Sequence, residues 1–243
     1  MEGKLLNLEL LKVPAQENKI AVLAYEPRRE RRVSLVVGHG YSSSKHNLDV
    51  LCNFLASHGF AVYSLDFPGH KLGASCGRLR SVDDLIDAMR AVVDMARKRD
   101  VGPIYTLGHS MGAMTALFSA ALDPKIAGAV AIATGYGRPS ALETLQSKGS
   151  DLRASYVEGA SLPELMIGVD ERYQTLLPRL AGRPVLYVAA DRDMMVNKRS
   201  VEQLYDKAPE PKTFALISSD HTYAGENART EVLQWLNGLH PRR

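Results

Sequence analysis

Hydrophobic and polar positions follow two different periods along the chain. Short apolar runs such as Val33–Val37 and Ala61–Leu65 are rich in β-branched residues. Runs of this kind are typical of strands buried on both faces of a sheet. Between Leu48 and Leu55, by contrast, apolar residues recur at every third or fourth position, which predicts an amphipathic helix. The regular succession of strand and helix predicts a parallel sheet with right-handed crossovers.

These two periods, together with local end signals, predict the strands and helices of the chain. Prolines at 14 and 27 close the first two predicted strands, and the first of these reads as an edge strand. Ser81 and Asp84 resemble a capping box at the start of a long helix. The predicted strands cover 4–13, 19–25, 33–37, 61–65, 104–107, 127–133, 184–190 and 213–217, and the predicted helices cover 48–58, 82–96, 113–121, 201–208 and 228–239.

One stretch interrupts this alternation. Between Gly135 and Gly182 the sequence is polar and favours helix, without a clear strand. It is too long for an ordinary connection between two elements. We therefore expect one α/β domain over residues 1–243, with a small helical cap inserted at about 136–181. We also expect helices on both faces of a mostly parallel sheet.

Composition adds few constraints. The chain has 243 residues, of which 45% are hydrophobic and 23% charged, as in ordinary globular proteins. A net charge of +3 does not indicate nucleic-acid binding, which usually needs a clustered basic face. The densest basic stretch, Arg28–Arg32, lies between two predicted strands and is interpreted as a solvated hairpin loop.

The cysteines and the start of the sequence bear on the compartment in which the protein is expected. Cys52 and Cys76 are too few for a disulfide framework or a zinc cluster, and Cys52 is expected to be a buried free thiol. The chain begins without a basic segment followed by an apolar core, and it contains no run of 18 apolar residues. We expect a cytoplasmic protein without a membrane span.

Candidate chemistry begins at Gly108–Gly112, which reads G-x-S-x-G between a predicted strand and a predicted helix. Two glycines around Ser110 would let neighbouring elements approach closely while the serine occupies a strained turn. The five-residue pattern alone is common by chance. Its meaning depends on whether the chain supplies the partners that a nucleophilic serine needs.

Those partners are sought at the carboxyl ends of the other predicted strands, where reactive groups of an open α/β sheet gather. His221 follows the last predicted strand, at the start of the closing helix, and is the candidate base. Asp191 and Asp193 both follow the strand at 184–190. Asp193 is favoured as the acid that orients the histidine, and Asp191 is expected to fix the loop.

Two backbone amides are expected to stabilise an oxyanion. Met111 follows the serine at a helix N-terminus, and Tyr41 follows Gly40 after the strand at 33–37. His39 is interpreted as a hydrogen-bonding residue that shapes its loop without a catalytic part. His109 is expected to point away from the serine.

In this order, Ser110, Asp193 and His221 make the chain resemble the α/β-hydrolase superfamily. Within it, the sequence is similar to small esterases and monoacylglycerol-lipase-like enzymes grouped with the S33 serine aminopeptidases. The motifs that carry the resemblance are Gly38–Gly40, Asp66–His70, Gly108–Gly112 and Asp191–Val196. The resemblance implies an acyl-enzyme mechanism with a small-molecule ester substrate and without a cofactor or metal.

The chain also departs from that pattern. After His70 the family usually continues Gly-x-Ser, whereas this sequence continues with Lys71–Ser75. The catalytic histidine is often preceded by glycine, whereas Asp220 stands here. Neither change removes a catalytic atom. For the substrate we expect contacts from Tyr136, Met166 and Met194.

Other functions remain open from the sequence. A thioesterase or a peptidase would use the same triad, and an aminopeptidase would need an acid for the substrate's amino group. A non-catalytic binding protein on this fold would have lost part of the triad, yet every position is filled. A dinucleotide-binding domain is disfavoured because Gly135-Tyr136-Gly137 lacks the third glycine. The acidic residues of the insertion available to an aminopeptidase are Glu143, Glu158, Glu164 and Asp170.

Overall fold

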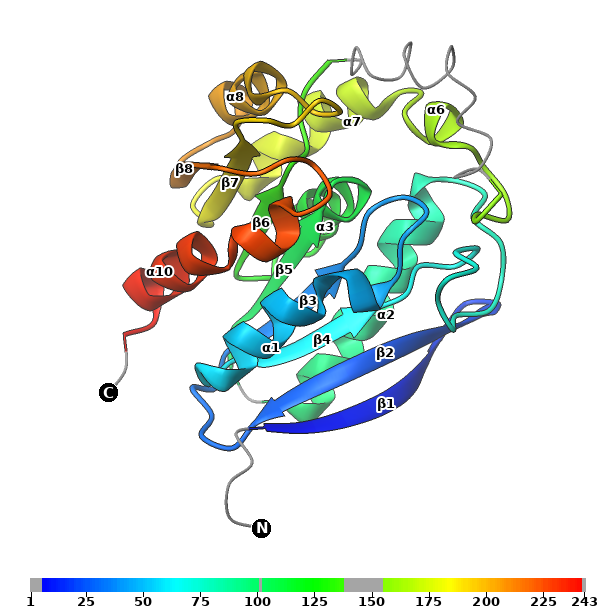
Figure 1. The fold of residues 1–243 in the computed structure, drawn as a ribbon, viewed down its shortest axis with the longest axis vertical. Coiled ribbons are helices and arrows are strands. Elements are labelled where there is room, and N and C mark those ends of the chain that lie inside the picture. Colours follow the sequence, from blue (N-terminus) through cyan, green and yellow to red (C-terminus); the bar gives the residue numbers. More distant parts are fainter. Residues whose placement is uncertain (1–5, 101, 138–154, 242–243) are drawn as a thin grey trace.

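The computed structural model describes residues 6–100, 102–137 and 155–241, and its eight strands form a single sheet (Figure 1). In space the strands follow the order β1-β2-β4-β3-β5-β6-β7-β8. β2 is antiparallel to both of its neighbours, and all strands from β4 to β8 run parallel. The strands are β1 (Leu6–Ala15), β2 (Asn18–Pro27), β3 (Ser34–Gly38), β4 (Ala61–Leu65), β5 (Ile104–His109), β6 (Gly128–Ile132), β7 (Val185–Ala190) and β8 (Lys212–Ile217).

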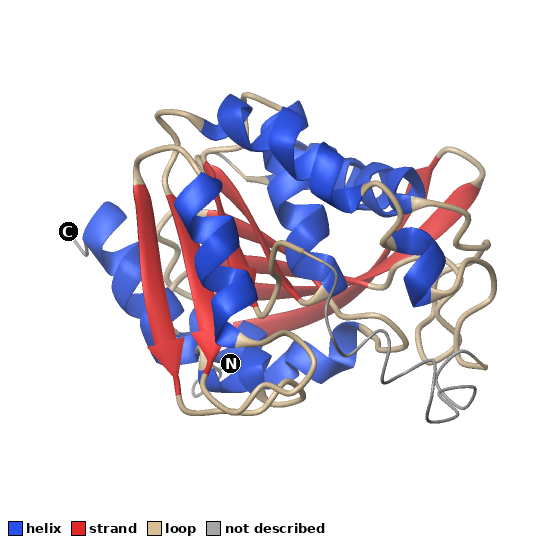
Figure 2. Ribbon diagram, turned by 90° about the horizontal axis from the view of Figure 1, so that it is seen from above, coloured by secondary structure: helices blue, strands red, loops and turns tan. Residues whose placement is uncertain are grey.

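Helices cover both faces of this sheet (Figure 2). One face carries α1, α9 and α10, and the other carries α2, α3 and α8. The mostly parallel sheet with helices on both faces, predicted from the sequence, is confirmed. The helices are η1 (Lys45–Leu48), α1 (Asp49–Ser57), α2 (Val82–Arg99), α3 (Met111–Leu122), α6 (Leu162–Leu165), α7 (Val169–Leu176), η2 (Leu177–Leu180), α8 (Lys198–Lys207), α9 (Ala224–Asn227) and α10 (Arg229–Leu239).

Alternation along the strands divides the core into two layers. In β3, Leu35 and Val37 face α1 and α10, while Val36 faces α2 and α3. All three side chains are fully buried, as expected for a strand covered on both sides. The capping box predicted for α2 is present: Ser81 accepts from the helix amides and Asp84 accepts from the Ser81 amide.

The strand order reverses at β3, which lies between β4 and β5. The chain therefore leaves β3 toward one side of the sheet and leaves β5 toward the other. Such a switch point opens a crevice at the carboxyl ends of the strands, where ligands bind in open α/β sheets. The loop after β3 and the turn after β5 meet at this crevice.

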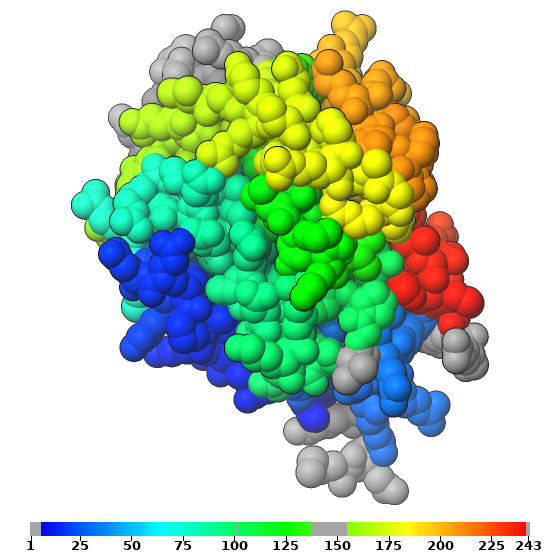
Figure 3. Space-filling view, turned by 180° about the vertical axis from the view of Figure 1, so that it is seen from behind, coloured from blue at the N-terminus to red at the C-terminus, as the bar shows by residue number. Residues whose placement is uncertain are grey.

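Between β6 and β7 the chain forms a small helical cap. We call residues 155–180 the cap segment; it contains α6, α7 and η2. Arg172 of α7 makes two hydrogen bonds of 2.7 and 2.8 Å to the carboxylate of Asp83 at the start of α2. Viewed from behind, α7 and η2 (yellow) lie against α3 (green) (Figure 3). The predicted cap boundaries at about 136–181 stay a prediction, because residues 138–154 lie outside the described part of the chain.

One expectation about the loops is wrong. The basic stretch Arg28–Arg32 does not close a hairpin, because β4 lies between β2 and β3 in the sheet. Nor is it solvated throughout: Arg31 donates a 2.6 Å hydrogen bond to Asn237 of α10 and stacks over Phe60. The sequence pattern showed two neighbouring strand-like runs but not that a later strand would insert between them.

The expected thiol is found, since Cys52 is a buried free cysteine of α1. In the described ranges, no helix combines the length and apolar character that crossing a bilayer requires.

Candidate active site

The turn between β5 and α3 holds Ser110 in a strained backbone conformation, with φ 55° and ψ −119°. This turn is possible because its two glycines lie against backbone. A Cβ on Gly108 would come within 2.1 Å of Gly112, and a Cβ on Gly112 would come within 2.1 Å of the Gly38 carbonyl oxygen. Any side chain at either position would force strand, turn and helix apart. The G-x-S-x-G pattern is thus a packing requirement that leaves the serine at the apex.

Three side chains from distant parts of the sequence form a hydrogen-bond chain at this apex. His221 Nε2 lies 3.1 Å from Ser110 Oγ, and His221 Nδ1 lies 2.7 Å from Asp193 Oδ2. Because the carboxylate can only accept, Nδ1 carries the proton and Nε2 is left to accept from the serine hydroxyl. This is the arrangement that activates a serine for nucleophilic attack.

Asp193 is fixed from its other side as well. Its Oδ1 accepts hydrogen bonds of 2.8 Å from the amides of Met195 and Val196, and its side chain is fully buried. Asp191 has a different place: its side chain is 42% exposed and accepts a 3.0 Å bond from the Ser219 amide. It ties the loop after β7 to the loop after β8. Asp193, and not Asp191, is thus the acid in contact with His221, while its role as the orienting acid stays a prediction.

The position of His221 differs slightly from the expectation. It lies in a turn that precedes the short helix α9, whereas the closing helix α10 begins only at Arg229. Asp220 accepts a 3.0 Å bond from the Tyr223 amide within that turn. The side chain at 220 therefore serves the local turn, and the histidine still reaches the serine.

The loop after β3 passes close to the serine. A Cβ on Gly40 would lie 3.3 Å from His109 Nδ1, a tight contact, and 3.5 Å from Ser110 Cβ, an ordinary one, so the backbone at Gly40 lies directly beside the serine. Tyr41 follows directly, and Met111 is the first residue of α3. An amide in the first turn of a helix has no acceptor within the helix. The backbone at these two positions thus borders the serine from two sides.

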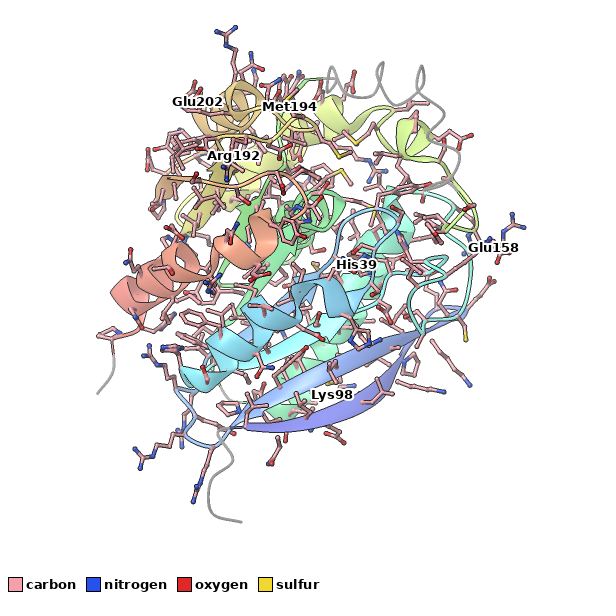
Figure 4. All side chains as sticks on the ribbon, in the orientation of Figure 1. His39, Lys98, Glu158, Arg192, Met194 and Glu202 are labelled. Atoms are coloured by element: carbon pink, nitrogen blue, oxygen red, sulfur yellow. The ribbon has the colours of Figure 1, made fainter. Side chains whose placement is uncertain are left out.

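His39 fixes the conformation of that loop through two hydrogen bonds. The amide of Phe67 donates a 3.0 Å bond to His39 Nε2, so Nδ1 carries the proton and donates a 2.7 Å bond to the Gly40 carbonyl. Burial, together with the neighbouring His70 ring, lowers the pKa of His39 to about 3. His39 (labelled in Figure 4) is a neutral, loop-shaping residue, in agreement with the sequence interpretation.

A buried ion pair fixes the far end of the same loop. Lys45 is 3% exposed, and its Nζ lies 2.7 Å from Oδ2 of the fully buried Asp66. Asp66 also accepts 2.7 Å bonds from the amides of Lys45 and Ala74. The pair joins the loop after β3 to the loop after β4. Sequence reasoning missed it, because a lone lysine among serines reads as a solvated loop residue.

His109 does not simply point away, as the sequence suggested. Its ring packs against that of His221, with centroids 4.8 Å apart. Burial, with a smaller contribution from His221, lowers the pKa of His109 to about 3. His109 therefore stays neutral beside the base and adds no positive charge next to it.

The protonation of His39 gives a prediction about stability. The unfolded chain takes up a proton on this residue below a pKa of 6.5, whereas the folded protein does so only near 3. The free energy of unfolding is therefore expected to fall as the pH falls below 6.5, with His39 contributing a loss of about 2 kcal/mol between pH 7 and pH 5. Urea unfolding at the two pH values measures it.

The matched controls are His39→Gln and His46→Gln. The first variant should show a smaller loss between the two pH values than the wild type. His46 is 57% exposed, so its replacement should leave the loss unchanged. An unaltered pH dependence in His39→Gln would contradict the assignment.

A cavity that is open to solvent begins at Ser110 and His221. Of the three residues expected to contact the substrate, only Met166 lines it. Met194 (labelled in Figure 4) is 89% exposed, and its neighbour Met195 takes the place in the wall. Tyr136 lies outside the lining and stacks with Lys207 instead. The apolar part of the wall comprises Met111, Met114, Ala133, Leu162, Met166, Met195 and Val196.

Within the described ranges, no group of three His, Cys, Asp or Glu side chains is placed to hold a metal ion.

Fold and geometry together define a class of protein. A mostly parallel sheet with helices on both faces and a Ser–His–Asp hydrogen-bond chain at its carboxyl edge is the α/β-hydrolase arrangement. The chain belongs to the family described as serine aminopeptidase, S33, whose model matches residues 29–167.

Individual relatives agree with this placement. The chain is 32% identical over 220 residues to the phospholipase YtpA of Bacillus subtilis, a match covering 84% of this chain and 81% of that protein. It is 26% identical over 145 residues to a monoglyceride lipase homolog of Monkeypox virus, covering 58% of this chain and only 52% of the viral protein.

Solved structures show the same fold at lower identity. Est1E of Butyrivibrio proteoclasticus with bound ferulic acid superposes with a TM-score of 0.74 at 18% identity, covering 94% of this chain and 98% of that one. The esterase Pf2001 of Pyrococcus furiosus gives a TM-score of 0.74 at 18% identity, covering 97% of this chain and 89% of that one.

Proposed function

We propose that this protein is a serine hydrolase that cleaves carboxylic esters with small or medium acyl groups. The observation that carries the proposal is the hydrogen-bond chain Asp193–His221–Ser110, which ends at the mouth of an apolar cavity. Membership of a hydrolase family, with a phospholipase and a monoglyceride lipase homolog among the relatives, supports an ester as substrate.

In the proposed reaction, Ser110 Oγ attacks the acyl carbon as His221 Nε2 takes the hydroxyl proton. The tetrahedral intermediate collapses when the alcohol leaves with that proton, and the acyl group stays on the serine. Water then attacks the acyl-enzyme, with His221 again as base, and releases the acid. Asp193 stabilises the imidazolium that forms in each half of the reaction.

The amides of Tyr41 and Met111 are the proposed donors to the oxyanion. They border Ser110 from the loop after β3 and from the N-terminus of α3, where the helix dipole also favours negative charge. A single donor of this kind is typically worth about 3 kcal/mol in the transition state. His39 and the Lys45–Asp66 pair hold the loop that carries Tyr41, so the donor is positioned before substrate binds.

The acids expected for an aminopeptidase are used elsewhere, as far as the structure describes them. Glu158 pairs with Arg78, Glu164 caps the start of α6, and Asp170 accepts from the Gly137 amide. The remaining candidate, Glu143, lies outside the described residues. The apolar lining around Met166 is better suited to an acyl chain than to an amino group, and we therefore favour ester over peptide cleavage.

Labelling with a fluorophosphonate, followed by peptide mapping, tests the proposal. We expect one labelled peptide, modified at Ser110, and we expect the label to abolish ester hydrolysis. Labelling at another serine would overturn the scheme. Parallel assays of an ester, its thioester and its anilide separate the esterase from the thioesterase and the peptidase; faster turnover of either analogue would change the assigned leaving group. The expected cytoplasmic location stays a prediction.

A further inference from the structure

The start of the cap segment is joined to the loop after β4 by backbone hydrogen bonds. The Glu158 amide donates to the Gly69 carbonyl at 2.8 Å, and the Leu79 amide donates to the Glu158 carbonyl at 2.9 Å. The Ala160 amide donates in turn to the Leu79 carbonyl at 2.6 Å. Figure 1 shows α6 and the chain before it beside this loop. The cap segment is therefore held firmly up to Ala160.

Tyr41 contacts this junction from the active-site side. Its phenol O–H donates a 3.2 Å hydrogen bond to the Ala160 carbonyl, and its ring lies edge-on to His70 with centroids 5.8 Å apart. The same residue supplies the backbone amide proposed for the oxyanion. Tyr41 thus has its main chain beside the reacting serine and its side chain on the cap segment.

The distance along the chain from this contact to the cavity wall is short. Ser161 follows Ala160 and forms a capping box with Glu164, which fixes the start of α6. Leu162, two residues after Ala160, and Met166, just after α6, both line the cavity. An acyl group in the cavity would contact Leu162 and Met166, at the two ends of α6. The carbonyl of Ala160, two residues before α6, accepts the hydrogen bond from Tyr41, so the acyl contact and the Tyr41 contact lie close together along the chain.

We propose that Tyr41 is a positioning residue that couples acyl-group packing against the cap to the placement of the oxyanion donor. The inference rests on the proposed ester hydrolysis and adds a specificity device to it. The cap then selects acyl groups through kcat as well as through binding, because the acyl chain remains in the cavity throughout deacylation. An acyl group too short to reach Leu162 and Met166 does not contact the cap, and its turnover gains nothing from the coupling.

The test compares Tyr41→Phe with the wild type on p-nitrophenyl acetate, butyrate, hexanoate and octanoate. Phenylalanine keeps the ring against His70 and the backbone amide, and removes only the hydroxyl that binds Ala160. We expect wild-type kcat to rise with chain length until the acyl group contacts the cap. In Tyr41→Phe we expect kcat to fall for every ester, and to fall roughly fivefold more for the best long ester than for acetate, as loss of one hydrogen bond allows.

Tyr156→Phe is the matched control. Tyr156 lies in the same junction and is 44% exposed, and the described residues offer its hydroxyl no partner. This variant should keep the wild-type chain-length series. If Tyr41→Phe loses kcat by the same factor for all four esters, or only raises KM, the hydroxyl merely braces the cap and the coupling is disproved. A wild-type enzyme without activity on any ester would instead refute the proposed function.

Discussion

Ser110→Ala is expected to lower kcat/KM for short p-nitrophenyl esters by roughly 10⁴-fold or more, which is typical when a triad nucleophile is removed. His221 Nε2 and the cavity would remain, but no atom would be left within 3.1 Å of the base to attack the acyl carbon. The measurement is a steady-state assay with a protein preparation free of contaminating esterase.

The fold should tolerate this change. Alanine lacks only the hydroxyl and keeps the Cβ of serine. The strained turn at φ 55° therefore costs the variant no more backbone strain than the wild type. We therefore expect the thermal midpoint of the variant to stay close to that of the wild type. Retention of wild-type activity by a folded Ser110→Ala protein would refute the mechanism.

Asp193→Asn is expected to cost about 10³- to 10⁴-fold in kcat. The asparagine carbonyl can still accept from the Met195 and Val196 amides, so the loop keeps its shape. Its NH₂ group then faces His221 Nδ1, which must accept instead of donate. The proton moves to Nε2, and the ring no longer has a lone pair for the Ser110 hydroxyl.

Asp191→Asn is the matched substitution. Asp191 precedes Asp193 by two positions but accepts from the Ser219 amide, a bond that an asparagine carbonyl can replace. We expect less than a tenfold loss of kcat. A larger loss in Asp191→Asn than in Asp193→Asn would show that the wrong acid has been assigned to His221.

Much of the fold could be predicted because local patterns determine it. The strand Ala61–Leu65 was predicted with its observed bounds, since a short apolar run between a glycine and a polar turn has few alternatives. The start of α2 was predicted from one capping box. The order in which the strands pair is harder to predict, because the insertion of β4 between β2 and β3 depends on contacts far apart in sequence. For that reason the sequence wrongly predicts a hairpin loop at Arg28–Arg32.

That Ser110, Asp193 and His221 lie close together could be predicted, because each lies within a few residues of the carboxyl end of a strand. The strand ends bring Ser110, Asp193 and His221 to one edge, whatever the loops between them do. The direction in which a loop residue points its side chain is not determined by the strand ends. Met194 and Met195 are adjacent in a turn held by Asp193, and that turn directs one outward and the other into the cavity wall.

Buried polar residues were the least predictable part of the site. Lys45 and Asp66 are 21 positions apart, and the sequence around neither residue indicates that the two form an ion pair. From its place in the insertion Tyr136 is expected in the substrate pocket, but it lies outside the cavity lining and its ring stacks with Lys207 at the end of α8. Only packing in three dimensions distinguishes these roles.

The junction between the cap segment and the loop after β4 has a consequence for engineering. Its hydrogen bonds join main-chain groups, and its glycines are needed for clearance: a Cβ on Gly159 would come within 1.9 Å of the Leu79 carbonyl oxygen. Exposed side chains along this junction can therefore be replaced without loss of its main-chain hydrogen bonds, provided that the glycines and the Tyr41 contact are kept. A redesigned cap would also have to keep the buried side chains that pack it against the sheet, such as Leu165 and Tyr173.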